Sequence, residues 1–185
     1  MKTEEINKLS FDIHLANVKA GWWDNPEECI YQKLQLISTE IAEATEGARK
    51  NLMDDHLPYR LMAEVEIADV LIRLLDLGGK LLLCYHPDNT AQGIYGHLHW
   101  DGERATLGKQ HLTLNQCLMI LTAAYSQDAK GQTNAAYSQF IDTIKLVADY
   151  NNYDLFNVMA EKIEYNSVRK DHTRLERDKN RGKKF

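Results

Sequence analysis

The fold is decided by residues 59–79, which read YRLMAEVEIADVLIRLLDLGG. Apolar side chains occupy nearly every side of the helical cylinder that this segment would form, which is typical of a helix buried inside a bundle. Its polar residues lie on one line, at spacings of three, four and three: Glu66, Asp69, Arg73 and Asp76. Ionised carboxylates in a buried helix are costly unless they are paired or bind a metal. We therefore predict a central helix over 59–77, ending at Gly78-Gly79, with functional carboxylates.

A second acidic stripe lies on the preceding segment, which is predicted to be helical from 26 to about 52. Glu40 and Glu43 stand three residues apart beside its apolar face, and Glu46 follows three residues later. A short connection makes the two helices antiparallel neighbours, so that their acidic stripes face each other. The carboxylates then repel one another unless a divalent cation compensates, and oxygen donors alone suit Mg²⁺ or Mn²⁺. The ligands expected on this reasoning are Glu40, Glu43, Glu66 and Asp69.

The rest of the chain also favours helices. No glutamate is followed three residues later by histidine, which excludes the ligand pattern of di-iron bundles. With 185 residues, 44% of them hydrophobic, the chain fits a single domain. We expect an all-α antiparallel bundle whose further helices cover 3–19, 115–125, 133–150 and 154–172.

Residues 86–111 hold four of the ten glycines and four of the seven histidines, and are predicted to form a long loop. A histidine metal site there is a weaker hypothesis than a polar loop. Within the single domain 1–185 we expect a core of 1–80 and 151–172, an insertion over about 81–150, and a basic tail over 173–185.

The net charge of −5 is unevenly distributed. Residues 169–185 carry eight Lys and Arg against three Asp and Glu, a net +5, so the remainder carries −10. An acidic body argues against a nucleic-acid polymer as partner, because phosphate neutralisation needs clustered basic residues.

No apolar run is long enough for a membrane span, and the opening MKTEEINKLSF is unlike a signal peptide, so we expect a cytoplasmic protein. Cys29, Cys84 and Cys117 form no CxxC pair and are predicted to be packing residues.

The spacing Glu40-x-x-Glu43 and Glu66-x-x-Asp69 resembles the ExxE and ExxD signature of the all-α nucleoside triphosphate pyrophosphohydrolase superfamily, which includes MazG-like proteins and dimeric dUTPases. The surrounding strings KLQLISTEIAEATEGARK (33–50) and EIADVLIRLLDLGG (66–79) are similar as well. EKIEYNSVRKDH (161–172) resembles the closing helix of the family, which carries a Lys, an Asn and an Arg. The similarity covers about 19–77 and 154–184, and leaves roughly 84–150 unmatched.

This resemblance implies a MazG-like bundle with an inserted loop and extra helices. Short chains of the family complete their bundle by dimerising, whereas the extra helices here offer the alternative of a bundle completed within one chain; we favour a homodimer. It also implies hydrolysis of a nucleoside triphosphate to the monophosphate and pyrophosphate, for control of the nucleotide pool, with dUTP, dCTP or damaged nucleotides as substrates. Glu43 is expected to act on the attacking water, with Glu46 the less favoured choice. Lys162, Asn166 and Arg169 are one face of one helix and are expected to hold phosphates.

Further candidates come from a cluster near residue 20. Trp22 and Trp23 are candidates for an apolar wall beside a base, and Asn17 for reading the edge of that base. Lys33 and Arg49 are alternative phosphate contacts, though ordinary surface charges are the simpler interpretation.

Two other interpretations stay open. One is a non-catalytic helical binding or assembly module whose acidic seam pairs with basic partners. The other keeps the metal site but changes the substrate to a nucleotide-sugar or another diphosphate.

Overall fold

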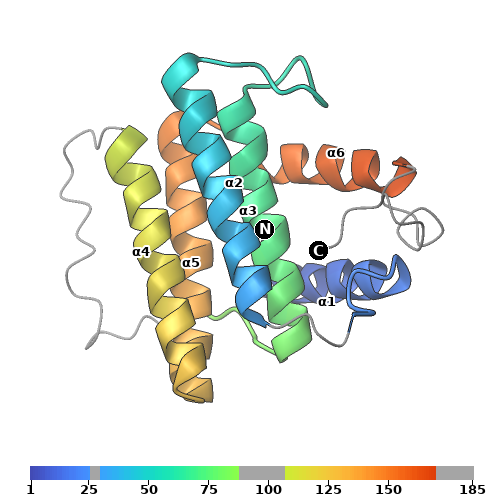
Figure 1. The fold of residues 1–185 in the computed structure, drawn as a ribbon, viewed down its shortest axis with the longest axis vertical. Helices are drawn as coiled ribbons and strands as arrows, with labels where there is room; N and C mark the ends of the chain where they lie inside the picture. The colour runs from blue at the N-terminus through green and yellow to red at the C-terminus, as the bar shows by residue number, and fades with distance from the viewer. Residues whose placement is uncertain (26–29, 88–106, 170–185) are drawn as a thin grey trace.

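The computed structural model describes residues 1–25, 30–87 and 107–169 (Figure 1). The described residues form helices and no strand, with the following bounds: α1 (Thr3–Lys19), α2 (Ile30–Lys50), α3 (Met62–Leu81), α4 (Leu107–Ser126), α5 (Lys130–Asn151) and α6 (Leu155–Val168). The expected all-α fold is confirmed. No helix within these ranges has both the length and the apolar character that crossing a bilayer would require.

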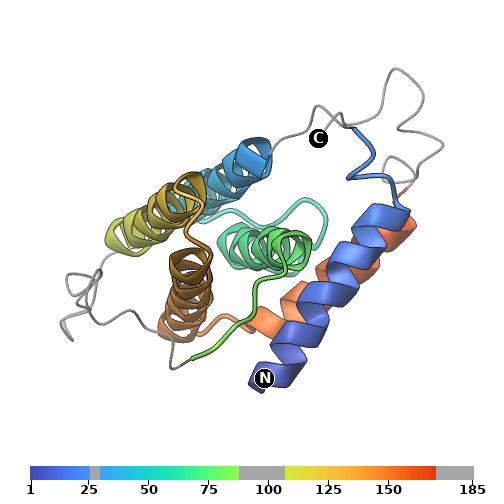
Figure 2. The same ribbon diagram turned by 90° about the horizontal axis from the view of Figure 1, so that it is seen from below.

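Helix α3 lies at the centre of the molecule (Figure 2). It contacts α2 and α5 on one side, and α1 and α6 on the other. Because α4 in turn contacts α2 and α5, helices α2, α3, α5 and α4 close a four-helix bundle, and α1 and α6 cross one side of it (Figure 1). Side chains on several sides of α3 are fully buried, among them Val65, Ile67 and Ala68. The apolar character of residues 59–77 therefore predicted this central position correctly.

The connection between α2 and α3 brings the two acidic motifs together. An isolated antiparallel bridge joins Met53 to Leu61, and the Met62 N–H donates to the Leu52 carbonyl over 2.9 Å. A Cβ built on Gly47 would lie 2.9 Å from the Met62 side chain, so this glycine permits close approach of α2 to the start of α3. The two helices consequently run antiparallel, as the short connection predicted.

Helix α3 does not end at Gly78-Gly79. It continues to Leu81, and Leu82 closes it in the left-handed conformation at φ 54°. The two glycines serve packing instead: a Cβ on Gly78 would lie 2.3 Å from the Tyr137 hydroxyl, and one on Gly79 would lie 2.5 Å from His14 Cβ. The predicted stop is therefore wrong, because these positions need small residues where α5 and α1 approach α3.

The polar residues of α3 are not confined to one line, contrary to the prediction. Glu64 lies off that line and is also buried. Its Oε1 accepts a hydrogen bond of 2.8 Å from the backbone N–H of Asp154, the residue that precedes α6. This carboxylate therefore anchors the start of α6 against α3 and has a structural partner of its own.

Helices α4 and α5, from the segment predicted as an insertion, form two of the four bundle helices. Helix α4 starts earlier than expected, so that His111 is a buried helical residue and not part of a loop. Of the predicted loop, 88–106 lies outside the described residues, as does the basic tail 173–185. Helix α6 is described to Val168, four residues short of the predicted end.

The cysteines divide between core and surface. Cys117 packs in the core, whereas Cys84 is exposed and Cys29 lies outside the described residues. Cys84 was predicted to pack and does not, because beyond the end of α3 it is exposed between two residues that are buried in its place, Leu83 and Tyr85. There the Asn134 carboxamide pairs with both the N–H and the carbonyl of Cys84, at 2.7 and 2.8 Å.

Candidate metal and nucleotide site

One pocket of about 420 Å³ lies beside α3 and is walled by residues of α1, α2, α3 and α6 and of two connections. All ten side chains that the sequence predicted for the site line this pocket: Asn17, Trp22, Trp23, Glu40, Glu43, Glu66, Asp69, Lys162, Asn166 and Arg169. They come from segments up to 152 residues apart, from Asn17 to Arg169. The structure thus gathers the predicted residues around one cavity.

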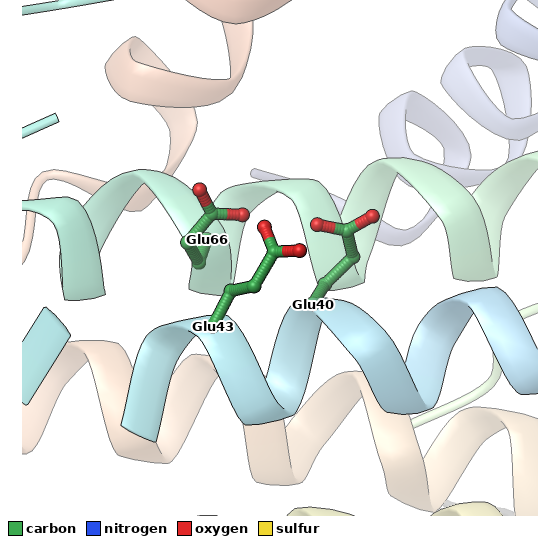
Figure 3. A group of neighbouring side chains, drawn as sticks. All are labelled: Glu40, Glu43 and Glu66. Atoms are coloured by element: carbon green, nitrogen blue, oxygen red, sulfur yellow. The ribbon is translucent and has the colours of Figure 1, made fainter. Parts of the chain in front are cut away.

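The acidic end of the pocket is built by α2 and α3. Glu40 and Glu43 project from α2 towards Glu66 on α3 (Figure 3). One carboxylate oxygen from each of the three lies within 4.8 Å of the others. Glu40 and Glu66 are buried whereas Glu43 is exposed, so the cluster has a closed side and an open side. Three converging oxygen donors of this kind suit a hard divalent cation.

Glu66 has the strongest reason to bind a cation. Glu66 is 6% exposed, and its Oε2 atom is buried without a hydrogen-bond partner within the described part of the chain. Burial raises the pKa of Glu66 to about 9, and the negative charges of Asp69 and Glu40 act in the same direction. A buried, unpaired carboxylate oxygen is costly. A cation between Glu66, Glu40 and Glu43 would supply the missing partner, so the donor set fits Mg²⁺.

The fourth predicted ligand has a different partner. Asp69 lies one turn beyond Glu66 and forms an ion pair of 2.9 Å with Lys162 Nζ from α6. Burial raises the pKa of Asp69 to about 6, and the neighbouring Lys162 opposes that rise. Arg73 Nε similarly donates to Glu40. Two of the four carboxylates are therefore neutralised by basic residues of the chain itself.

Another part of the pocket wall is formed by α6 and the residue after it. Lys162 is 4% exposed, and Asn166 follows one turn later on α6. Arg169 also lines the pocket, but the prediction that it shares their helical face is wrong, because it follows the last helical residue in an extended conformation. The Arg169 guanidinium lies 5.6 Å from the centre of the Tyr165 ring. An ammonium, a carboxamide and a guanidinium side by side can donate to several phosphate oxygens.

The other end of the pocket contains a group that sequence reasoning found only in part. Asp76 is buried at the end of the polar line of α3 and accepts hydrogen bonds from three side chains, listed with their distances: His14 Nδ1 (2.9 Å), Asn17 Nδ2 (2.8 Å) and Trp23 Nε1 (3.0 Å). His14 was not predicted. Its position at i−3 from Asn17 on α1 is a usable signal, but only once α1 is known to cross α3 at Asp76.

Two further residues line the pocket: Lys33, which was predicted to be a surface charge, and His56, which was not predicted. Lys33 is not an ordinary surface charge: it is 9% exposed, its Nζ donates to the Trp22 carbonyl over 3.0 Å, and it lies 4.8 Å from the centre of the Trp23 ring. His56, from the connection between α2 and α3, also lines the pocket and stacks near Tyr165 at 4.9 Å. No motif in the sequence pointed to His56.

The less favoured candidates lie outside the pocket. Glu46 forms ion pairs with Arg49 and Lys50 on the outer side of α2, and neither Glu46 nor Arg49 lines the cavity. His86 and His111 do not line it either, and His97 and His99 lie outside the described residues.

Comparison with known proteins adds nothing to this site. No protein-family model, no curated protein and no solved structure matches the chain.

Proposed function

We propose that this chain is a Mg²⁺-dependent nucleoside triphosphate pyrophosphohydrolase, which converts a nucleoside triphosphate and water to the monophosphate and pyrophosphate. The observation that carries the proposal is the buried Oε2 of Glu66, which has no hydrogen-bond partner among the described residues and lies beside Glu40 and Glu43. The same pocket presents Lys162, Asn166 and Arg169. A metal–triphosphate complex requires carboxylates that hold the metal and, in the same cavity, side chains that donate hydrogen bonds to the phosphate oxygens.

The residues divide the work as follows. Glu40, Glu43 and Glu66 would hold the ion, with Asp69 available one turn away. Bound Mg²⁺ supplies Lewis-acid stabilisation of the charge that develops on the phosphate oxygens. Glu43, the exposed member, accepts a proton from the attacking water. The new bond joins the water oxygen to the α-phosphorus, the position implied by the family resemblance, and the bond to pyrophosphate breaks.

Lys162 and Arg73 would have partners both in the empty site and in the site with metal and nucleotide bound. Without substrate, Lys162 and Arg73 neutralise Asp69 and Glu40. If Glu40 and Asp69 held a metal ion, Arg73 and Lys162 would be available to pair with phosphate oxygens. We propose a cytoplasmic enzyme that acts on the nucleotide pool.

The test is a panel of ribo- and deoxyribonucleoside triphosphates, with a nucleotide-sugar and a diphosphate included, incubated with Mg²⁺. We expect pyrophosphate release from triphosphates, and loss of at least a hundredfold in kcat for Glu43→Gln and Asp69→Asn. Glu46→Gln is the matched control, because Glu46 lies one turn after Glu43 and outside the pocket. Release of orthophosphate instead, or an unaffected Asp69→Asn variant, would contradict the mechanism.

The competing proposal is a non-catalytic helical module with an acidic seam. The observation in its favour is that the seam already binds basic side chains, through the pairs Arg73–Glu40 and Lys162–Asp69. Calorimetric titration separates the two. Mg²⁺-dependent binding of a non-hydrolysable nucleotide supports the enzyme, and absence of binding supports the module.

A further inference from the structure

The end of the pocket remote from the carboxylates is organised by Asp76. It lies ten residues after Glu66 on α3, or roughly 15 Å along the helix axis. We call Asp76, His14, Asn17 and Trp23 the Asp76 cluster. The Asp76 carboxylate is 9% exposed, and its two oxygens accept three hydrogen bonds, two at Oδ1 and one at Oδ2.

This arrangement fixes the orientation of the Asn17 carboxamide. A carboxylate only accepts hydrogen bonds, so Asn17 must present Nδ2 to Asp76, as it does over 2.8 Å. Rotating the carboxamide by 180° would place Oδ1 against Asp76 Oδ2, with two acceptors facing each other. Asn17 Oδ1 is thereby left as an acceptor on a residue that lines the pocket.

The other members of the cluster are held firmly. The Trp23 ring is bonded at its edge to Asp76, and Lys33 and Lys80 place ammonium groups 4.8 and 5.2 Å from its centre. These contacts hold the Trp23 ring in place. In the proposed complex we expect the polar edge of Asn17 to discriminate between bases.

The backbone supports the same geometry. Gly79 allows α1 to approach α3 closely, because any Cβ there would lie 2.7 Å from the Ser10 carbonyl oxygen. Ser10 Oγ donates to the Leu75 carbonyl over 2.7 Å, one residue before Asp76. Helix α1, which carries His14 and Asn17, is therefore anchored to α3 at the level of the cluster.

We propose that Asp76 is a positioning residue that sets the base preference of the pocket, by fixing Asn17 with Oδ1 as the acceptor. This inference rests on the proposed function. An acceptor at that point favours bases with an exocyclic amino group, such as cytosine, over bases that present a carbonyl there, such as uracil. A site built to bond a donor rejects an analogue that lacks it, because its own polar group is left unpaired.

The test measures kcat/KM for cytosine and uracil nucleoside triphosphates on the wild type and on Asp76→Asn. Asparagine offers an amide N–H in place of one oxygen, so Asn17 can turn round and present Nδ2 to the base. We expect the ratio of kcat/KM for cytosine over uracil to fall at least tenfold, mainly through KM. Tryptophan emission should stay near its wild-type maximum, because the oxygen that remains can still accept from Trp23 Nε1. Asn17→Ala, which removes the carboxamide, should bring the ratio near one even if Asp76→Asn does not fold.

The matched control is Asp142→Asn. Asp142 is also a partly buried carboxylate that accepts side-chain hydrogen bonds, from Tyr85 and Lys145, but it does not line the pocket. Its ratio should stay at the wild-type value.

The outcomes separate the two proposals. A wild type that releases pyrophosphate but prefers uracil overturns the inference and leaves the proposed function standing. The same holds if Asp76→Asn or Asn17→Ala lowers activity on both bases equally, which is a merely structural effect. A wild type that releases no pyrophosphate from any nucleotide overturns the proposed function itself.

Discussion

The four residues on the polar line of α3, which are Glu66, Asp69, Arg73 and Asp76, differ in the partners of their polar groups. Within the described part of the chain Glu66 Oε2 has no hydrogen-bond partner, Asp69 pairs with Lys162, Arg73 donates to Glu40, and Asp76 accepts from three side chains. Along the helix the partners therefore change from none, to basic side chains, to a fixed set of hydrogen-bond donors. In the proposed complex this order would match that of metal, phosphates and base.

Glu66 gives a pH-dependent prediction for the metal-free protein. Its pKa rises on folding from an ordinary 4.5 to about 9, because of burial first and the neighbouring carboxylates second. The folded state therefore holds a proton that the unfolded state has lost between these values. The free energy of unfolding should consequently fall as pH rises from 7 to 9, by at most about 1.4 kcal/mol per pH unit. Thermal unfolding in EDTA checks this, and Glu66→Gln should flatten the dependence.

Mg²⁺ should reverse this behaviour in the wild type, because the cation replaces the proton on Glu66. We expect Mg²⁺ to raise the Tm more at pH 9 than at pH 7, and to have little effect on Glu66→Gln. Glu46→Gln, the exposed acidic control on α2, should behave like the wild type. A Glu66→Gln variant that keeps the full Mg²⁺ response would show that the ion binds elsewhere.

Lys162 gives a second prediction at this scale. Replacing it by methionine leaves Asp69 in a desolvated site without its cation, so the free energy of unfolding in EDTA should fall by about 3 kcal/mol. Adding Asp69→Asn to that variant should restore part of the loss. Urea unfolding measures both. Lys145→Met is the control, because the Lys145–Asp142 pair is about 30% exposed and is expected to contribute under about 1 kcal/mol. Equal losses for Lys162→Met and Lys145→Met would contradict the argument.

The partners of these residues show which features of the site can be predicted from the sequence and which cannot. Spacing within one helix predicts that Glu66 and Asp69 share a face, since only the helical repeat is needed. It does not predict that Asp69 meets Lys162, because that contact depends on how α6 crosses α3. The His14–Asp76 contact, between residues 62 apart, is hidden for the same reason.

At the scale of the helix, composition predicts position better than it predicts boundaries. The apolar surface of residues 59–77 identified α3 as central because no other environment accommodates such a helix. Gly78-Gly79 was misread because a glycine that ends a helix and a glycine that admits a neighbouring helix look the same in sequence. Only the contacts with Tyr137 and His14 distinguish them.

This distinction predicts opposite effects for two glycine substitutions. Alanine normally stabilises a helix relative to glycine by about 1 kcal/mol. At Gly78 the new Cβ would lie 2.3–2.7 Å from three atoms of the buried Tyr137 ring and hydroxyl, so Gly78→Ala should destabilise by about 1–3 kcal/mol. At Gly131, in the first turn of α5, nothing lies within 4 Å, and Gly131→Ala should be neutral or stabilising. Urea unfolding compares the two, and a stabilised Gly78→Ala variant would contradict the packing role.

At the scale of the whole molecule, one chain forms both a closed bundle and the pocket. Helices α4 and α5 complete the four-helix arrangement with α2 and α3, which is the alternative of a bundle completed within one chain. The family motifs could not decide this, because they do not cover α4 and α5. The ten predicted site residues come together within one chain. The homodimer remains a separate prediction.

A surface for that dimer is available on α1. Phe11, Leu15 and Val18 lie at spacings of four and three on one face and are 58%, 41% and 37% exposed. Exposed apolar stripes of this kind are typical of protein contacts. We expect the wild type to sediment as a dimer and Phe11→Glu to sediment as a monomer. Because Phe11 does not line the pocket, the monomer should keep the wild-type kcat/KM per chain. Sedimentation and kinetics at one protein concentration test both parts: a monomeric wild type removes the dimer, and an inactive monomeric variant shows that a second copy completes the site.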